Sequence, residues 1–141
     1  MLVRLLYASR AQEGAGVEQM QSILQACRSK NPEEGITGIL CHSGGIYMQV
    51  LEGGRITVNR LYNLIAKDSR HKDVVVLHYE EVSERLFSSW TMGQVDLAKV
   101  NPSLLLKYSE KPVLDPYSVS GKASMALLQE LIATAHIVGR A

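Results

Sequence analysis

Short apolar segments separated by turn residues fill the first hundred positions and predict a sheet. Five segments are expected to be strands: residues 2–8, 36–43, 45–53, 73–82 and 89–95. Residues 2–8, LVRLLYA, are apolar at odd and even positions alike, which is typical of a strand whose sheet is covered on both faces. The second and third strands meet at Ser43-Gly44-Gly45, and this short glycine turn predicts a hairpin.

Apolar positions at helical spacing predict two helices between these strands. They are Val17, Met20, Ile23, Leu24 and Cys27 in the first helix, and Val58, Leu61, Tyr62 and Ile65 in the second, which follows the Gly53-Gly54 turn. Asn31-Pro32 is expected to end the first helix, because the residue before a proline disfavours the helical conformation. The order β-α-β-β-α-β-β predicts an α+β, ferredoxin-like fold with both helices on one face of a mixed sheet.

A helical extension over residues 97–141 is predicted to pack on the same domain as residues 1–96. Its expected parts are a short helix from Asn101 to about Lys107, a loop with two prolines at residues 111–118 and a longer helix over residues 120–138. The longer helix carries an apolar stripe of Met125, Leu128, Leu131, Ile132 and Ala135. We expect this stripe to cover the back face of the sheet, and contact with another subunit is the alternative.

Composition and charge restrict the classes of function. The chain carries 15 Lys and Arg against 14 Asp and Glu, without a basic block, which disfavours direct nucleic-acid binding. Its longest apolar runs, such as residues 74–77, are far shorter than a membrane span. The first residues do not resemble a signal peptide. We therefore expect a cytoplasmic, single-domain protein that does not enter a membrane.

The cysteines and most of the histidines predict neither a disulfide framework nor a metal site. Cys27 and Cys41 form no C-x-x-C pair and are expected to be reduced, buried thiols. His42, His78 and His136 lack the spacing of metal ligands.

Two polar residues in apolar strands are candidates for chemistry. Tyr7, taken alone, is typical of a core tyrosine with a satisfied hydroxyl. Gln49 stands between Met48 and Val50, so its amide must find partners or cost about 1–3 kcal/mol. Taken alone it predicts a buried structural hydrogen bond.

The segments around these residues resemble a known family. LVRLLYAS, RSKN and IYMQVLEG, framed by GITGIL, DSRH and FSSWTMG, are similar to the BLUF family of blue-light sensors that use FAD. The resemblance runs from about Leu2 to Val95, and the motifs follow the family order. It implies FAD bound noncovalently, and without a dinucleotide fingerprint, because the chain has no G-x-G-x-x-G. The expected slot lies between the two helices, lined by Ile23, Leu24 and Ile65.

The resemblance implies a photoactive pair and a set of flavin contacts. Tyr7 would give an electron and a proton to the excited flavin, and Gln49 would rearrange its hydrogen bonds, shifting absorption to the red. Asn31 would hold the flavin C4 carbonyl, with Lys30 reaching the C2 carbonyl edge. The pair Arg70 and His71 would lie beside the ring, with Asp68 orienting the arginine.

The resemblance also implies how the signal would leave. Trp90 and Met92 share a parity on the predicted strand 89–95, which alone favours core packing; in the family the matching residues couple the glutamine to that strand. The implied function is a photoreceptor that is not an enzyme, is homo-oligomeric and signals to an unidentified protein. The alternatives are a small flavoenzyme or acylphosphatase-like hydrolase, for which no nucleophile–base pair is evident, and a plain ferredoxin-like interaction module without flavin.

Overall fold

The computed structural model describes residues 1–12, 17–134 and 137, and the side chains of Val17 and Met20 are outside that description. Its elements, in chain order, are β1 (Leu2–Ala11), α1 (Val17–Glu34), β2 (Thr37–Ser43), β3 (Ile46–Gly54), α2 (Arg55–Lys67), β4 (His71–Val82), β5 (Gly93–Asp96), the 3-10 turn η1 (Leu97–Lys99), α3 (Pro102–Tyr108) and α4 (Gly121–Ala133).

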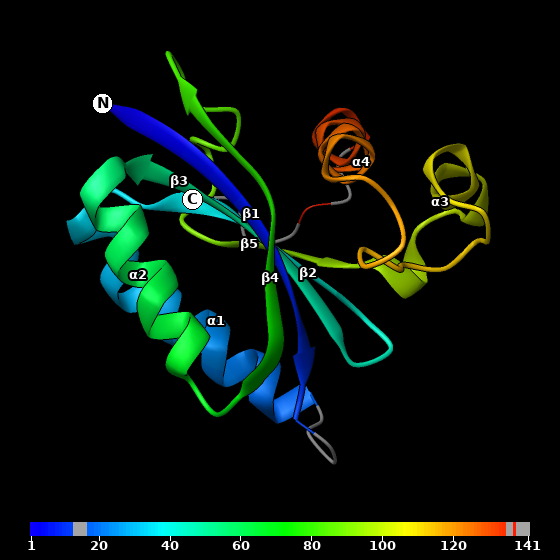
Figure 1. Ribbon diagram of the computed structural model, residues 1–141, viewed down its shortest axis with the longest axis horizontal. Helices are drawn as coiled ribbons and strands as arrows, with labels where there is room; N and C mark the ends of the chain where they lie inside the picture. Colours follow the sequence, from blue (N-terminus) through cyan, green and yellow to red (C-terminus); the bar gives the residue numbers. More distant parts are fainter. Residues whose placement is uncertain (13–16, 135–136, 138–141) are drawn as a thin grey trace.

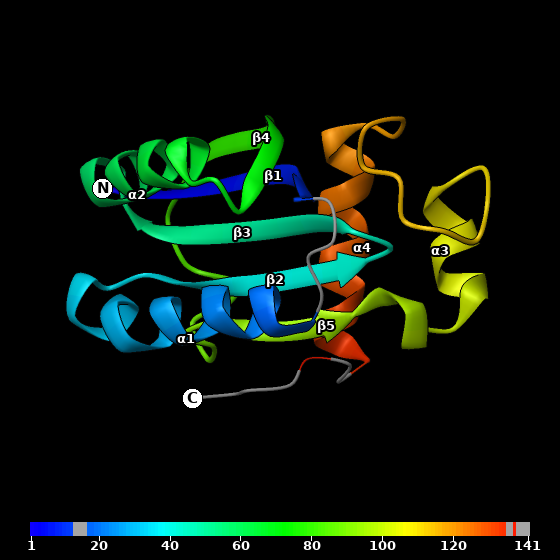
Figure 2. The ribbon, with the colours of Figure 1, turned by 90° about the horizontal axis from the view of Figure 1, so that it is seen from below.

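The described strands form one mixed sheet with helices on both faces. The strand order is β4-β1-β3-β2-β5, with β5 parallel to β2 and the other neighbours antiparallel. Helices α1 and α2 lie on one face, and α4 crosses the opposite face (Figures 1 and 2). This arrangement confirms the predicted α+β, ferredoxin-like fold with α1 and α2 on one face of the sheet and a C-terminal helix on the other.

The hairpin between β2 and β3 forms as its glycines predict. Gly44 and Gly45 have φ angles of 55° and 79°, so both occupy the left-handed region that a two-residue turn of this kind requires. Ser43 pairs with Ile46 directly beside the turn. This pairing sets the register that places Gln49 in the middle of the sheet.

The first helix does not end at Asn31-Pro32, and that prediction is wrong. Helix α1 includes Pro32 and runs to Glu34. Gly35 then adopts a φ of +71°, and the Ile36 N–H donates to the Asn31 carbonyl at 3.0 Å, which closes the helix with a glycine cap. The helix continues through Pro32 for two residues although proline has no N–H to donate, and Asn31 is thereby held inside the helix.

The predicted strand 89–95 is also wrong at its start, because β5 covers only Gly93–Asp96. The carbonyls of Thr91 and Met92 accept from side chains of α1, while the Trp90 carbonyl accepts from the Gly38 N–H of β2 at 3.0 Å. Asn31 Nδ2 donates to Thr91 O at 3.1 Å, and Arg28 Nε donates to Met92 O at 3.3 Å. Trp90 and Met92 therefore lie in an irregular segment that is fastened to α1.

Strand β3 contributes to two separate hydrophobic cores. Tyr47 and Leu51 belong to the core beneath α1 and α2, which we call the helix-side core. Met48 and Val50 belong to the core beneath α4, which we call the back core. Gln49 shares the parity of Tyr47 and Leu51, so it points toward α1 and α2.

Helix α4 packs its apolar stripe on the back of the sheet. Met125, Leu128 and Leu131 are buried in the back core, with Ile132 partly buried against it. The helix ends at Ala133 and not near residue 138 as predicted; residues 135, 136 and 138 lie outside the described part of the chain. Beyond the helix, Ile137 packs against the back core and lies close to Gly93, where an added Cβ would meet it at 2.5 Å.

A buried carboxylate holds the segment between β4 and β5. Glu52, on β3, is 0% exposed and accepts hydrogen bonds from Arg4 Nε at 2.8 Å, Leu86 N at 2.9 Å and Phe87 N at 2.8 Å. The Thr37 hydroxyl also lies within 3.4 Å of Glu52 Oε1. The segment that leads to Met92 is thus tied to the strand that carries Gln49.

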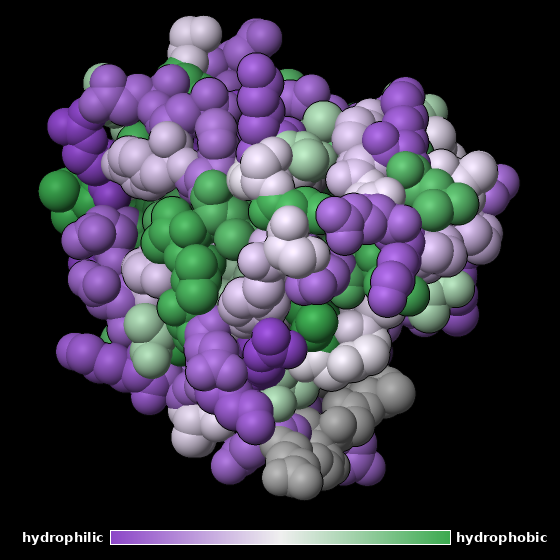
Figure 3. All heavy atoms as spheres, turned by 45° about the vertical axis from the view of Figure 1, so that its right-hand side comes forward, coloured by the Kyte–Doolittle hydropathy of each residue, from purple (hydrophilic) through white to green (hydrophobic). Residues whose placement is uncertain are grey.

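Strand β4 forms one edge of the sheet. Val75, Val76 and Tyr79 are 43%, 43% and 48% exposed along it. Hydrophobic side chains gather on part of the face shown in Figure 3, among mostly polar neighbours. The Tyr117 hydroxyl donates to the carbonyl of Asp73 at 2.8 Å, near the start of this strand.

Within the described chain, no helix is long and apolar enough to cross a membrane.

Candidate functional site

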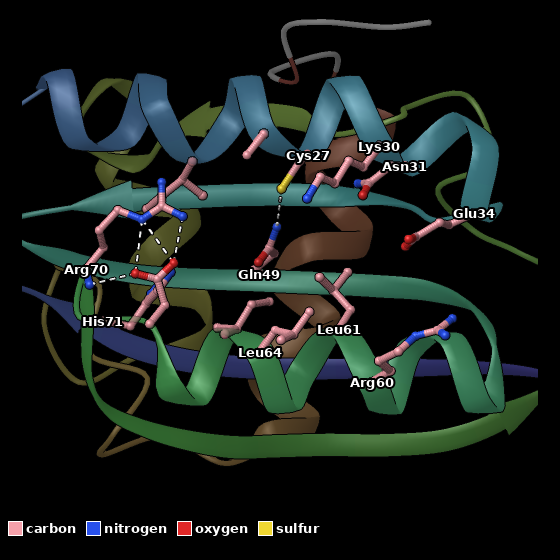
Figure 4. Close-up of a pocket in the computed structure, with 14 residues that line it drawn as sticks. Cys27, Lys30, Asn31, Glu34, Gln49, Arg60, Leu61, Leu64, Arg70 and His71 are labelled. Atoms are coloured by element: carbon pink, nitrogen blue, oxygen red, sulfur yellow. Dashed lines mark hydrogen bonds and ion pairs between the residues drawn. The ribbon is translucent and has the colours of Figure 1, made fainter.

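A pocket opens between α1 and α2 above the sheet, in the slot predicted from the sequence (Figure 4). Its volume is about 360 Å³, within the range of small-molecule sites. The apolar lining comes from Ile23 and Ala26 on α1 and from Leu61, Leu64 and Ile65 on α2. The polar lining consists of Cys27, Lys30, Asn31, Glu34, Gln49, Arg60, Asp68, Arg70 and His71.

The pocket brings together most of the residues singled out in the sequence: Ile23, Lys30, Asn31, Gln49, Ile65, Arg70 and His71. Leu24 does not line it, and that expectation is corrected. Leu24 is 0% exposed and lies in the helix-side core. One residue further along an α-helix is rotated by about 100°, which turns Leu24 from the pocket toward the sheet.

Tyr7 and Gln49 face each other across neighbouring strands. They are direct partners in the antiparallel register of β1 and β3, and the Tyr7 hydroxyl donates to Gln49 Oε1. The two residues are 0% and 1% exposed. Burial, reinforced by the nearby Cys27 thiol, raises the pKa of Tyr7 well above its usual value. The phenol therefore stays protonated and keeps its hydrogen bond.

The other end of the Gln49 amide contacts sulfur atoms. Its Nε2 lies 3.2 Å from Met92 Sδ and 3.8 Å from Cys27 Sγ. Cys27 was expected to be an ordinary buried thiol, but it is only partly buried and lines the pocket. Its position four residues before Asn31, on the same side of α1, was the signal in the sequence that would have found it.

Asn31 has one amide hydrogen engaged and a second to offer. It is 2% exposed, and its Nδ2 donates to Thr91 O at 3.1 Å. An amide nitrogen carries two hydrogens, so the other one remains for a ligand in the pocket. The contact to Thr91 orients this side chain, which removes much of the entropy cost of binding.

Asp68 holds Arg70 at the opposite end of the pocket, as expected. Arg70 Nε lies 3.1 Å and 3.0 Å from the two carboxylate oxygens, and a terminal guanidinium nitrogen lies 2.6 Å from Oδ2. The hydrogen bond from Arg70 lowers the pKa of Asp68. Arg70 also donates to Ser22 Oγ at 3.1 Å, which connects the end of α2 to α1.

His71 is fixed by a contact that the sequence did not indicate. Its Nδ1 lies 2.7 Å from Ser9 Oγ, and its ring packs edge-on at 6.1 Å from the ring of Tyr7 and 5.6 Å from that of Tyr47. Burial lowers the pKa of His71, with Asp68 partly opposing this. The imidazole is therefore neutral near pH 7, held at one nitrogen and with its ring at the pocket wall.

Trp90 and Met92 lie on opposite sides of the sheet, so the shared parity expected for them is wrong. Met92 is 0% exposed in the helix-side core, beside Gln49. Trp90 is 8% exposed in the back core, with its ring centroid 6.4 Å from that of Phe87. The irregular backbone of this segment replaces strand alternation, which is why parity failed as a guide.

The described part of the chain contains no group of three or more His, Cys, Asp or Glu residues that could hold a metal ion. His136, one of the histidines considered above, lies outside the described residues.

The pocket has the features needed for the flavin that the sequence resemblance implies. Apolar side chains from two facing helices, such as Ile23 and Ile65, suit the faces of a flat aromatic ring. Donors at its edge, the free amide hydrogen of Asn31 and the amine of Lys30, suit ring carbonyls. The residues present therefore fit a flavin.

Comparison with known proteins gives a consistent result. The family model "BLUF: Sensors of blue-light using FAD" matches residues 2–93. The photoactivated adenylate cyclase subunit beta of Euglena gracilis is 35% identical over 92 residues, covering 64% of this chain and 11% of that protein. The blue light- and temperature-regulated antirepressor BluF of Escherichia coli (strain K12) is 30% identical over 97 residues, covering 69% of this chain and 24% of that protein. The chain thus spans about a tenth to a quarter of these relatives.

Solved structures extend the similarity to nearly the whole chain. A structure titled "BlsA photo-activated state" is 30% identical with a TM-score of 0.84, covering 94% of this chain and 95% of that one. "BlrB - a BLUF protein, dark state structure" is 32% identical with a TM-score of 0.78, covering 95% of this chain and 96% of that one. The chain belongs to the BLUF family, the sensors of blue light that use FAD.

Proposed function

We propose that this chain binds FAD noncovalently between α1 and α2 and converts blue light into a rearrangement of the Gln49 hydrogen bonds. The observation that carries the proposal is the hydrogen bond from the Tyr7 hydroxyl to Gln49 Oε1 at the wall of the pocket. A phenol and an amide in direct contact form a path for a proton, and the phenol is also an electron donor.

Bound FAD, excited by blue light, supplies the electron acceptor. Tyr7 gives up one electron, and its phenolic proton moves along the existing hydrogen bond to Gln49 Oε1. Losing both together avoids a phenol cation in a site that is 0% exposed, where an unpaired charge is costly. Return of the electron to Tyr7 together with the proton from Oε1, after the amide has turned, would leave a new orientation. Return of the electron with a proton from Nε2, while Oε1 keeps the proton it gained, would leave a tautomer.

Gln49 suits this role because its amide has an acceptor end and a donor end. Its oxygen has a strong partner in Tyr7, while the partners of its nitrogen among the described residues are the sulfur atoms of Met92 and Cys27. An amide held firmly at one end and weakly at the other changes orientation at low cost once the strong bond is disturbed. The altered hydrogen bonding at the ring edge then shifts the absorption to the red.

We propose that the signal leaves through residues 90–92 toward the C-terminal helices. Met92 lies at the Gln49 amide, and Trp90, two residues earlier, packs in the same core as Leu128 of α4. A repacking of the flexible methionine is therefore transmitted through two peptide units to the opposite face of the sheet. An unidentified downstream protein and a second copy of the chain are the proposed receivers.

A hydrolase function receives no support from the pair of Ser9 and His71. Their 2.7 Å contact resembles that of a nucleophile and a base, and the sequence did not indicate it. Ser9, however, is 0% exposed and is not part of the pocket wall, so a substrate has no access to its hydroxyl. We infer that this pair orients the His71 ring toward the ligand and that the chain is a sensor.

A visible spectrum of the purified protein in darkness and under blue light tests the proposal. We expect a yellow protein with FAD as its only extractable flavin, and a small red shift that reverses in the dark without bleaching. A colourless protein that does not take up added FAD would contradict the proposal. So would a flavin spectrum that light leaves unchanged, or turnover of an acyl phosphate substrate.

A further inference from the structure

The two sulfur atoms at the Gln49 amide nitrogen differ in hydrogen-bonding capacity. Met92 Sδ, at 3.2 Å, is a thioether and can only accept. Cys27 Sγ, at 3.8 Å, belongs to a thiol, which accepts through sulfur and also donates its S–H. This difference becomes decisive when the amide changes orientation.

With the amide as it stands, both sulfur atoms accept from Nε2, and Tyr7 donates to Oε1. After a rotation that exchanges the two ends, the amide oxygen faces the sulfur atoms. A thioether and a carbonyl oxygen are both acceptors, so Met92 has no hydrogen bond to offer there. The Cys27 thiol can turn its hydrogen toward the oxygen without moving its sulfur.

We propose that Cys27 is a positioning residue for the switching glutamine, accepting from its amide nitrogen in the dark and donating S–H to its oxygen in the light-induced state. The proposal rests on the function proposed above, in which Gln49 rearranges. It assigns to this thiol the stabilisation of the lit orientation, which Met92 cannot provide.

The surroundings keep the thiol in place and protonated. Cys27 lies one helical turn before Asn31, and Asn31 is fastened to Thr91 O at 3.1 Å, so α1 is fixed relative to the segment that carries Met92. In Figure 4 the Cys27 side chain points from α1 toward Gln49. Burial raises the pKa of Cys27, which keeps its proton available for donation.

Infrared difference spectroscopy in the S–H stretching region tests the proposal, and the chain supplies its own control. Cys41 is the second thiol, 0% exposed in the back core on the other side of the sheet. Light should shift one S–H band, which disappears in Cys27→Ser and persists in Cys41→Ser. A light-induced S–H change that survives in Cys27→Ser, or no S–H change in wild-type protein that shows the red shift, would overturn the proposal.

Two further measurements separate positioning from simple packing. Cys27→Ala should shorten the life of the red-shifted state by about two- to tenfold, the range that one neutral hydrogen bond corresponds to, and Cys27→Ser, which keeps a donor and an acceptor, should restore it. In protein kept dark, Gln49→Leu should shift the Cys27 S–H band, which requires no photochemistry. Wild-type recovery in Cys27→Ala would contradict this role, whereas absence of any red shift in the wild type would instead reject the underlying function.

Discussion

Replacing Glu52 by glutamine should loosen the segment that carries Met92 while leaving the Tyr7–Gln49 pair chemically intact. The carboxylate accepts from Arg4, Leu86 and Phe87 at 2.8 Å to 2.9 Å. Glutamine keeps one acceptor oxygen and presents an NH2 group at the other position. At least one backbone N–H of the segment then faces a donor, and Arg4, which is 5% exposed, loses its buried counter-charge.

The expected loss follows from the number and kind of these contacts. Each hydrogen bond to a charged group contributes about 1.5–3 kcal/mol, and breaking one partner of a buried ion pair costs about 3–5 kcal/mol. We expect Glu52→Gln to lower the free energy of unfolding by about 3–5 kcal/mol, a large share of the 5–15 kcal/mol typical of a domain. Glu80→Gln is the matched control, since Glu80 also binds Arg4 but has a side chain that is 40% exposed.

Urea unfolding followed by circular dichroism and by tryptophan fluorescence measures the effect. Trp90 is the only tryptophan and reports on the tied segment directly. Glu80→Gln should change the free energy of unfolding by no more than about 1 kcal/mol, as exposed ion pairs do. If Glu52→Gln also stays within about 1 kcal/mol of wild type, the carboxylate does not hold this segment and the reasoning fails.

Four further outcomes are expected. Tyr7→Phe and Gln49→Leu should retain FAD but lose the red shift, since each removes one member of the proton path; a normal shift measured by absorption in either variant contradicts that path. Asn31→Ala should release FAD more readily in equilibrium dialysis, by about two- to tenfold for one lost hydrogen bond, and unchanged retention would show that Asn31 does not contact the flavin. Burial lowers the pKa of His71, so the stability that neutral His71 contributes is complete above the unfolded pKa near 6.5 and falls as the pH decreases toward the lowered folded pKa. His71→Asn should flatten the dependence of the free energy of unfolding on pH in this range, as measured by acid unfolding. An unchanged pH dependence would refute the assignment. Met92→Ala should keep the red shift yet reduce light-dependent hydrogen exchange in residues 101–134, and exchange equal to wild type would place the route elsewhere.

The sheet and its hairpin were predictable because their signals are local. Short apolar runs in LVRLLYA and in IYMQVLEG, with Gly44 and Gly45 between β2 and β3, indicate strands and turn within a few residues of each position. Parity also allowed Tyr7 and Gln49 to share a face. That the two are direct partners depends on the register between β1 and β3, to which no local signal contributes.

The missed features are contacts between distant parts of the chain. Asn31-Pro32 indicated a helix end, but Gly35 provides the cap that ends it one turn later. Thr91 and Met92 were expected to continue a strand, whereas their carbonyls are bonded by side chains of α1. Backbone held by such contacts does not alternate as a strand does. The sequence therefore could not predict that Trp90 and Met92 lie on opposite faces of the sheet.

In the candidate site, too, local patterns could be predicted and contacts between distant residues could not. The pocket residues lie in segments with a recognisable pattern, whereas the residues that orient them do not. Ser9 is two positions from Tyr7 and small enough to pass as a core residue, yet it holds His71 from 62 residues away. Cys27 was grouped with Cys41 as a buried thiol. Its spacing of four residues from Asn31 placed it on the pocket side of α1, but its contact with Gln49 depends on how α1 packs on the sheet.

The exposed edge of β4 has a consequence for how this protein behaves in concentrated solution. An edge strand with exposed Val75, Val76 and Tyr79 offers a template for intermolecular pairing and aggregation. Two irregularities in its pairing with β1 interrupt the even spacing of its backbone groups, and the Tyr117 hydroxyl occupies the carbonyl of Asp73. The two irregularities and the Tyr117 hydrogen bond limit the length of β4 on which a strand of another molecule could pair. A lysine at position 76 would therefore improve solubility at the outer edge without entering either core.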